Sequence, residues 1–155
     1  PRAAPGAVTD LGAAVEMLNR PPRRRGMAVV ISDFLSGGLG IGIEPSWERP
    51  LRKLGVRHDV LAVEVLDPRE LRLPSVGVLT VVDPETGLLH EVQTSSRKLR
   101  EAYAAAAATQ RTAIAQALRR SGAAHLRLRT DSDWLLDIVR FVAAQRRGQS
   151  RGTTR

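Results

Sequence analysis

The sequence predicts an α/β protein built on part of a doubly wound, Rossmann-like parallel sheet, with an antiparallel β-hairpin added. Short apolar runs rich in β-branched residues alternate along the chain with segments of helical spacing. The first run, residues 27–31, is apolar throughout and predicts a strand buried on both faces. Ser32 and Asp33 follow it directly, at the end of the strand where open α/β sheets bind ligands.

Length and composition indicate one globular domain without disulfides or thiol chemistry. The chain has 155 residues, of which 43% are hydrophobic and 26% charged, which is ordinary for a folded domain. It has no cysteine, which excludes disulfides and thiol chemistry. No apolar run reaches about 18 residues, so we expect no membrane segment in this chain. These features favour a cytoplasmic protein, although a longer protein could carry a membrane tether elsewhere. Because the first residue is Pro1, we expect a piece of such a longer protein.

The net charge of +8 has two interpretations. One is a nucleic-acid-binding basic module, since a basic surface attracts phosphates. The other, which we favour, is arginine spread over solvated surfaces. Aromatic residues make up only 3% of the chain, which argues against platforms on which bases stack. Nucleic acid is therefore not the partner that we expect, and it remains the alternative.

The first half of the chain predicts two helices and two strands. Thr9 or Asp10 can cap a helix at Leu11–Leu18, which ends before two prolines. Residues 36–43 are glycine-rich but lack the Lys-Ser/Thr ending of a phosphate-binding loop, so we interpret them as a loop. A helix is expected over residues 45–54, with Ser46 as its cap and an apolar stripe of Trp47, Leu51 and Leu54. Residues 60–66 predict the second strand.

The second half predicts a hairpin, a long helix, a strand and a last helix. Residues 76–82 and 88–94 flank a proline- and glycine-bearing turn, so we expect a hairpin that makes the sheet mixed. A helix over residues 97–120, capped by Ser95 or Ser96, has the inner stripe Leu99, Tyr103, Ala106, Gln110, Ile114, Ala117 and Leu118. A strand at Ala124–Arg129 precedes a helix with Trp134, Leu135, Ile138, Phe141 and Val142 facing inward. Residues 145–155 predict a disordered basic tail after a domain that ends at residue 144.

Several motifs resemble a known bacterial family. The segments at residues 9–11 and 30–34 are similar to the later part of a von Willebrand factor A-like domain. Those at residues 57–60, 67–70, 73–77 and 83–87 resemble the bacterial domain-of-unknown-function family fifty-eight, which is associated with MoxR-type AAA+ ATPases. The resemblance covers residues 8–144 and implies a carboxyl-terminal half of a von Willebrand A-like domain.

The resemblance also implies a metal site of which this chain carries a part. In von Willebrand A-type domains, three loops hold a divalent cation such as Mg²⁺, and oxygen ligands suit such a hard ion. Thr9 matches the second loop and Asp33 the third, with Ser32 beside it, while the Asp-x-Ser-x-Ser motif of the first loop has no match. We therefore expect a divalent cation in the complete domain and no tight binding by this chain alone.

The expected function is a metal-ion-assisted protein interaction, without enzymatic activity, in which a MoxR-type AAA+ ATPase is the candidate partner. A hydrolase that uses Asp33 is a third interpretation, but no nucleophile and base in the sequence support it. We also expect a homodimer, because the strand at residues 27–31 carries no charge or proline to discourage edge-to-edge pairing with its equivalent in a second copy.

Overall fold

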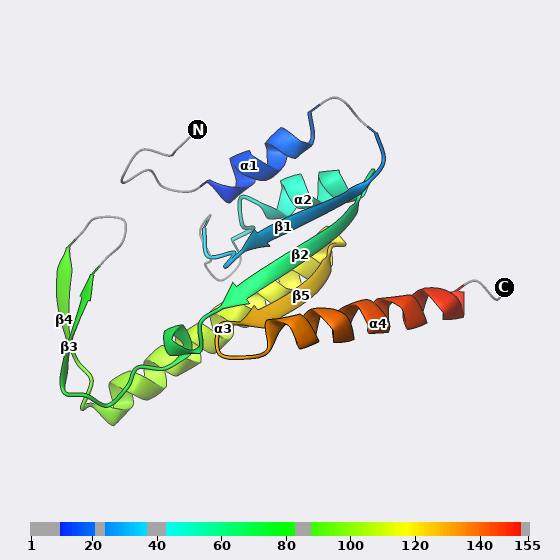
Figure 1. Ribbon diagram of the computed structural model, residues 1–155. Coiled ribbons are helices and arrows are strands. Elements are labelled where there is room, and N and C mark those ends of the chain that lie inside the picture. Colours follow the sequence, from blue (N-terminus) through cyan, green and yellow to red (C-terminus); the bar gives the residue numbers. More distant parts are fainter. Residues whose placement is uncertain (1–9, 21–23, 37–42, 83–87, 153–155) are drawn as a thin grey trace.

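The structure, a computed structural model, describes residues 10–20, 24–36, 43–82 and 88–152. Its centre is a parallel sheet of three strands, in the order β1 (Met27–Ser32), β2 (Asp59–Leu66) and β5 (Ala124–Arg129) (Figure 1). The hairpin of β3 (Val78–Val82) and β4 (Leu89–Gln93) is confirmed, but it forms a separate two-stranded sheet. The expectation of one mixed sheet is therefore wrong for the described residues.

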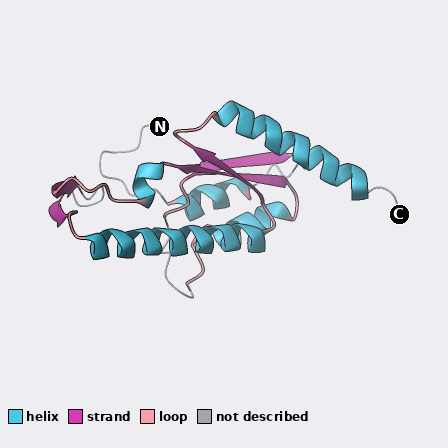
Figure 2. Ribbon diagram, turned by 90° about the horizontal axis from the view of Figure 1, so that it is seen from below, coloured by secondary structure: helices cyan, strands magenta, loops and turns pink. Residues whose placement is uncertain are grey.

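Helices lie on both faces of the parallel sheet (Figure 2). One face is covered by α1 (Leu11–Leu18), α2 (Glu48–Gly55) and α3 (Arg97–Ser121), while α4 (Trp134–Gly152) lies on the other face and packs against β5. A short 3-10 helix, η1 (Pro68–Leu71), follows β2. No helix in the described ranges is long and apolar enough to cross a membrane.

The ends of the helices are fixed by residues that the sequence singled out. The Asp10 side chain accepts a hydrogen bond from the Ala13 N–H at 2.9 Å and so caps α1. Ser96 caps α3 in the same way, through the Leu99 N–H. Gly122 ends α3 with φ of 77°, a left-handed conformation in which glycine is favoured.

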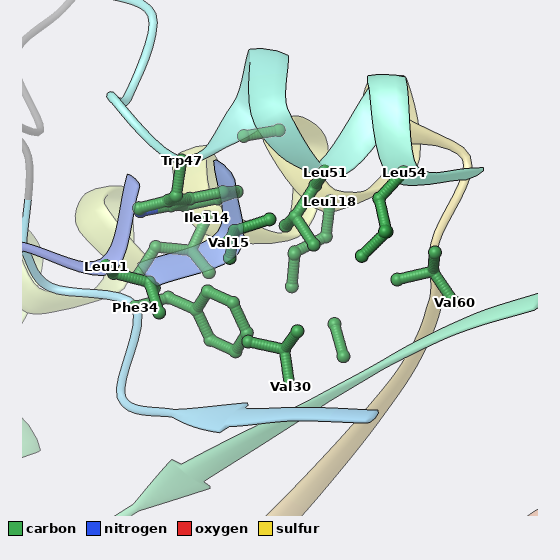
Figure 3. Packing of buried hydrophobic residues seen from close by; sticks show 12 residues of the cluster. Leu11, Val15, Val30, Phe34, Trp47, Leu51, Leu54, Val60, Ile114 and Leu118 are labelled. Carbon is green, nitrogen blue, oxygen red and sulfur yellow. The ribbon is translucent and has the colours of Figure 1, made fainter. Parts of the chain in front are cut away.

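The core lies between the sheet and the three helices on its covered face (Figure 3). The stripe of Trp47, Leu51 and Leu54 is confirmed, since these side chains are at most 1% exposed. The expected cap Ser46 does not cap α2, which begins one residue after Trp47 and has no side-chain cap. The Trp47 ring meets the Phe34 ring edge-on, with centroids 5.2 Å apart.

The length of α3 explains why the hairpin stands apart. Its 25 residues span about 38 Å, whereas a strand of six to eight residues spans about 20–26 Å. The first half of α3 therefore projects beyond the sheet, and the hairpin lies at its projecting end (Figure 1). The inner stripe is confirmed as buried at Ile114, Ala117 and Leu118. The prediction of burial is wrong for three residues of the stripe in the projecting half of α3, which are exposed: Leu99, Tyr103 and Ala106.

The face of the sheet that carries α4 is incompletely covered. The expectation that β1 is buried on both faces is wrong, because Met27, Val29 and Ile31 are 65%, 48% and 67% exposed. With Val65 of β2, which is also exposed, these side chains form what we call the open face.

The last helix also differs from the expectation. Ile138 and Phe141 of α4 are half-buried, but Trp134, Leu135 and Val142, expected to face inward, are exposed. The helix also continues to Gly152, so residues 145–152 are helical where the sequence indicated disorder.

Candidate functional site

The candidate site lies where β1 ends and α1 begins. The two elements run in opposite directions, so both of these ends lie at the carboxyl edge of the sheet (Figure 1). Leu11, the first residue of α1, and Phe34, just beyond β1, belong to the same buried cluster (Figure 3). Asp10 and Asp33 precede them in the chain, and both are exposed. Thr9 lies outside the described residues.

A network of local hydrogen bonds fixes the loop at residues 32–35. Asp33 Oδ1 accepts hydrogen bonds from the Leu35 N–H at 3.1 Å and from the Ser32 hydroxyl at 3.3 Å. The Ser32 oxygen in turn accepts one from the Phe34 N–H at 3.1 Å. These contacts engage one oxygen of the Asp33 carboxylate, and among the contacts of the described residues none engages the other.

Phe34 holds this loop in an unusual backbone conformation. Its φ of 58° is in the left-handed region, which bulky residues rarely adopt. Such a conformation costs on the order of 1–3 kcal/mol and persists only where the surrounding structure enforces it. Here the ring is fully buried and packed on Trp47. Burial of the Phe34 side chain thus fixes the direction of the neighbouring Asp33.

A buried charged residue lies beneath the loop. Glu64 of β2 is 0% exposed and stands beside Ser32 in the register of the sheet. Arg111 Nη1 of α3 donates to Glu64 Oε1 at 3.2 Å and also to the backbone carbonyl of Asp33 at 3.1 Å. Arg111 therefore connects the candidate ligand loop to the interior of the molecule.

Two further side chains complete what we call the charged cluster, made of Glu64, Arg111, His125 and Arg127. His125 Nε2 and Arg127 Nε lie 2.7 and 2.9 Å from Glu64 Oε2. Burial alone would raise the pKa of Glu64, but the hydrogen bonds and charges of His125 and Arg127 outweigh it and hold that pKa below its usual range. Glu64 is thus an ionised carboxylate whose partners are fixed in place.

The charged cluster was not predicted from the sequence, although the sequence contains one signal for it. Glu64 occupies an inward position of β2, in alternation with the buried residues Val60, Ala62 and Leu66. A charged residue at such a position needs a buried partner of opposite charge. Arg111 precedes the buried Ile114 by three residues and so lies on the inner side of α3.

Of the metal ligands expected from the sequence, the described residues include Asp33 and Ser32. The described residues contain no group of three or more histidine, cysteine or acidic side chains placed to hold an ion. Asp33 fits the role of one ligand, because its carboxylate is exposed and a carboxylate oxygen suits a hard cation. The Ser32 hydroxyl, the second candidate, is already engaged within the loop.

A basic groove lies between α3 and β5 on the covered side of the sheet. Arg119 and Arg127 line it together with Arg111 and the polar side chains of Thr112 and Gln116. Arg111 and Arg127 are partly neutralised by Glu64. Arg119 thus remains the arginine of this groove without an ion pair to Glu64.

The comparisons identify relatives without a described activity. The chain is 49% identical over 152 residues to uncharacterised proteins of Mycobacterium avium, Mycobacterium bovis and Mycobacterium tuberculosis. These matches cover 98% of this chain, 85% of the M. avium protein and 45% of the other two. The chain thus spans less than half the length of the M. bovis and M. tuberculosis proteins. The model of a family described as "Protein of unknown function DUF58" matches residues 2–113. No solved structure matches the chain significantly.

Proposed function

We propose a function for this chain, which belongs to the DUF58 family. The chain is the carboxyl-terminal part of a von Willebrand A-like domain that binds a protein partner through a divalent cation. In this proposal the chain catalyses no reaction. The observation that supports it most is the exposed Asp33 carboxylate, which the strained and hydrogen-bonded loop at residues 32–35 holds at the carboxyl edge of the sheet.

The geometry supports an interaction site better than a catalytic one. Asp33 has one free carboxylate oxygen, and its loop is connected to the core through Phe34 and Arg111. A fixed carboxylate can hold a cation that also takes an oxygen ligand from a partner, with water in the remaining positions. Mg²⁺ commonly keeps several waters and takes only one or two carboxylates from a protein.

The residues of this chain predict weak binding when it is tested alone. Asp33 is the one candidate ligand that the described part of the chain supplies, so water would fill most of the coordination sphere. We expect a dissociation constant for Mg²⁺ or Mn²⁺ weaker than about 10⁻⁵ M, the weak end of the range of sensor sites.

Paramagnetic Mn²⁺ tests the proposal even when binding is weak. We expect Mn²⁺ to broaden the amide signals of Asp33, Leu35 and Asp10 selectively in NMR spectra of the chain. Asp33→Asn should abolish this effect, because an amide is a poorer cation ligand than a carboxylate. Asp131→Asn is a matched control at another strand end, and it should change nothing at residues 32–35. Broadening centred elsewhere, or unchanged by Asp33→Asn, would refute the assignment.

The partner is the second part of the proposal, and it rests on the resemblance to the MoxR-associated family. Interferometry with a purified MoxR-type ATPase, without nucleotide, should show binding that Mg²⁺ strengthens and that EDTA or Asp33→Asn weakens. Random duplex DNA in the same instrument tests the alternative function. Tight DNA binding with a steep dependence on salt, unaffected by Asp33→Asn, would favour the basic module over the metal-assisted interaction.

A further inference from the structure

The amino edge of the parallel sheet, opposite the edge that carries Asp33, has a small pocket. It lies where α1 and α2 end and where the chain enters β2 (Figure 1). Its volume is about 200 Å³, below the roughly 300–1,000 Å³ of pockets that enclose drug-sized ligands, so it has room for one small chemical group. Four basic side chains and two apolar ones line what we call the amino-edge pocket: Arg20, Lys53, Arg57, His58, Leu18 and Val56.

The charge of the amino-edge pocket is positive. Arg20 follows α1, Lys53 belongs to α2 and Arg57 precedes β2, and no acidic residue of the described ranges lines the pocket. Lys53 is paired with Glu16, with Nζ 2.5 Å from Oε1. Arg20 and Arg57 are exposed, and neither forms an ion pair with another described residue. Because clefts lined by one sign of charge concentrate ions of the opposite sign, these two arginines favour an anionic ligand.

Contacts within the fold hold the walls of the pocket in place. Asn19, which also lines the pocket, donates from Nδ2 to the Pro50 carbonyl at 3.2 Å and so joins the end of α1 to α2. The His58 N–H donates to the Leu54 carbonyl at 3.0 Å, which fixes the segment between α2 and β2. A pocket with fixed walls loses little conformational entropy when a ligand binds. The ordering of the two arginine side chains is then the main entropic cost.

The lining suits a phosphate monoester better than other small anions. Such a group carries a charge of about −1.5 to −2 and three acceptor oxygens, so it can engage two guanidinium groups, whereas a carboxylate carries a single charge. Arginine is also the residue whose planar donors match phosphate oxygens in pairs. Leu18 and Val56 are 50% and 76% exposed, and they offer apolar contacts to the carbon atoms of an ester.

We propose that the amino-edge pocket binds a small phosphate monoester, with Arg20 and Arg57 holding the phosphate. Arg24 and Arg25 precede β1 at the same edge of the sheet but do not line the pocket. The backbone of a nucleic acid presents a row of phosphates, which needs cations along its path, whereas this pocket receives one phosphate. The pocket and the Asp33 loop lie at opposite edges of the sheet, so the proposal does not depend on the metal-assisted interaction.

An NMR titration of the full chain with phenyl phosphate tests the proposal. We expect saturable shifts of the amide signals of Arg20, Arg57 and His58, with a dissociation constant below about 1 mM. Inorganic phosphate should bind at least about fivefold more weakly, because it lacks the apolar group. Arg20→Gln and Arg57→Gln should each weaken the binding of phenyl phosphate by about tenfold. Both side chains are exposed and lack an ion pair within the described residues, so both variants should keep the melting temperature of the unmodified chain.

Arg24→Gln is the matched control, because it removes the same charge from the same edge outside the pocket. It should change the dissociation constant by less than about twofold. Equal weakening by Arg24→Gln and Arg57→Gln would overturn the proposal, since it would show general attraction to a basic edge. Shifts that do not saturate would also overturn it, and the two arginines would then act only at the ends of the helices. So would tighter binding of a short DNA duplex that all three substitutions weaken equally, which would indicate a nucleic-acid surface.

Discussion

At the scale of single residues, replacing Glu64 is expected to have a large effect on the free energy of unfolding. Glu64 is a fully buried carboxylate that contacts two arginines and His125, and of these Arg111 is itself buried. Removing one partner of a buried ion pair leaves an uncompensated charge, which typically costs about 3–5 kcal/mol. Within the charged cluster, Arg111 also donates a hydrogen bond to the backbone carbonyl of Asp33.

We therefore expect Glu64→Leu to lower the free energy of unfolding by about 3 kcal/mol, because Arg111 loses its buried partner and keeps the exposed Glu70, 3.5 Å from its Nη2, as its acidic neighbour. The double variant Glu64→Leu, Arg111→Leu should be more stable than Glu64→Leu alone, since it removes both charges. Urea unfolding of Glu64→Leu, of Arg111→Leu and of the double variant measures the coupling free energy between the two residues. Additive effects would show that Glu64 and Arg111 do not act as a pair.

The lowered pKa of Glu64 predicts how stability depends on pH. Because the folded chain holds this carboxyl ionised, the unfolded chain binds a proton at higher pH, near the ordinary value of 4.5. The stabilisation from Glu64 is thus complete above that pH and is lost as the pH falls through the lower pKa of the folded state. Unfolding curves between neutral pH and acid should show a steeper loss below about pH 4.5 in the unmodified chain than in Glu64→Leu, Arg111→Leu.

At the scale of elements, α1 and α2 approach each other so closely that only glycine fits at one position. A Cβ on Gly12 of α1 would lie 2.8 Å from the carbonyl oxygen of Ser46, just before α2. Asn19 at the end of α1 adds a hydrogen bond to the Pro50 carbonyl of α2 at 3.2 Å. These contacts hold the start of α1, and with it Asp10, at the carboxyl edge of the sheet.

Gly12→Ala should therefore destabilise the fold, although alanine is the better helix former by about 1 kcal/mol. The backbone oxygen of Ser46 cannot move freely, and overpacking of this kind costs about 1–3 kcal/mol. Gly26→Ala is the matched control, because nothing lies within 4 Å of its Cβ position. Thermal melting should separate the two variants, and equal melting temperatures would contradict the close approach.

Most helices and strands could be predicted because the residues that mark them are close together in the sequence. Apolar runs gave β1 and β2, and the capping residues Asp10 and Ser96 marked the starts of α1 and α3. Ser32 and Asp33 were predictable as site candidates because they follow an apolar strand directly. Arg111 was not, since helical periodicity selects apolar residues and does not show which charged residue finds a buried partner.

At the scale of the whole molecule, local signals were not sufficient. The hairpin was expected to extend the sheet, but α3 continues past the sheet and carries the hairpin with it. The apolar run of β1 predicted a strand buried on both faces, but α4 lies over β5 and leaves one face of β1 exposed. Both differences depend on which elements meet in space, and the sequence of one element does not contain that information.

The separate hairpin divides the chain into parts that should open independently. β3 and β4 bond to each other outside the parallel sheet, and none of their described side chains is buried. An isolated pair of strands is only marginally stable in water. Amide hydrogens of β3 and β4 should thus exchange with solvent through brief local opening, while those of β2 exchange only when the core unfolds. Hydrogen–deuterium exchange should show two classes of protection, and Glu64→Leu should reduce protection in β2 while leaving the exchange rates of the hairpin unchanged.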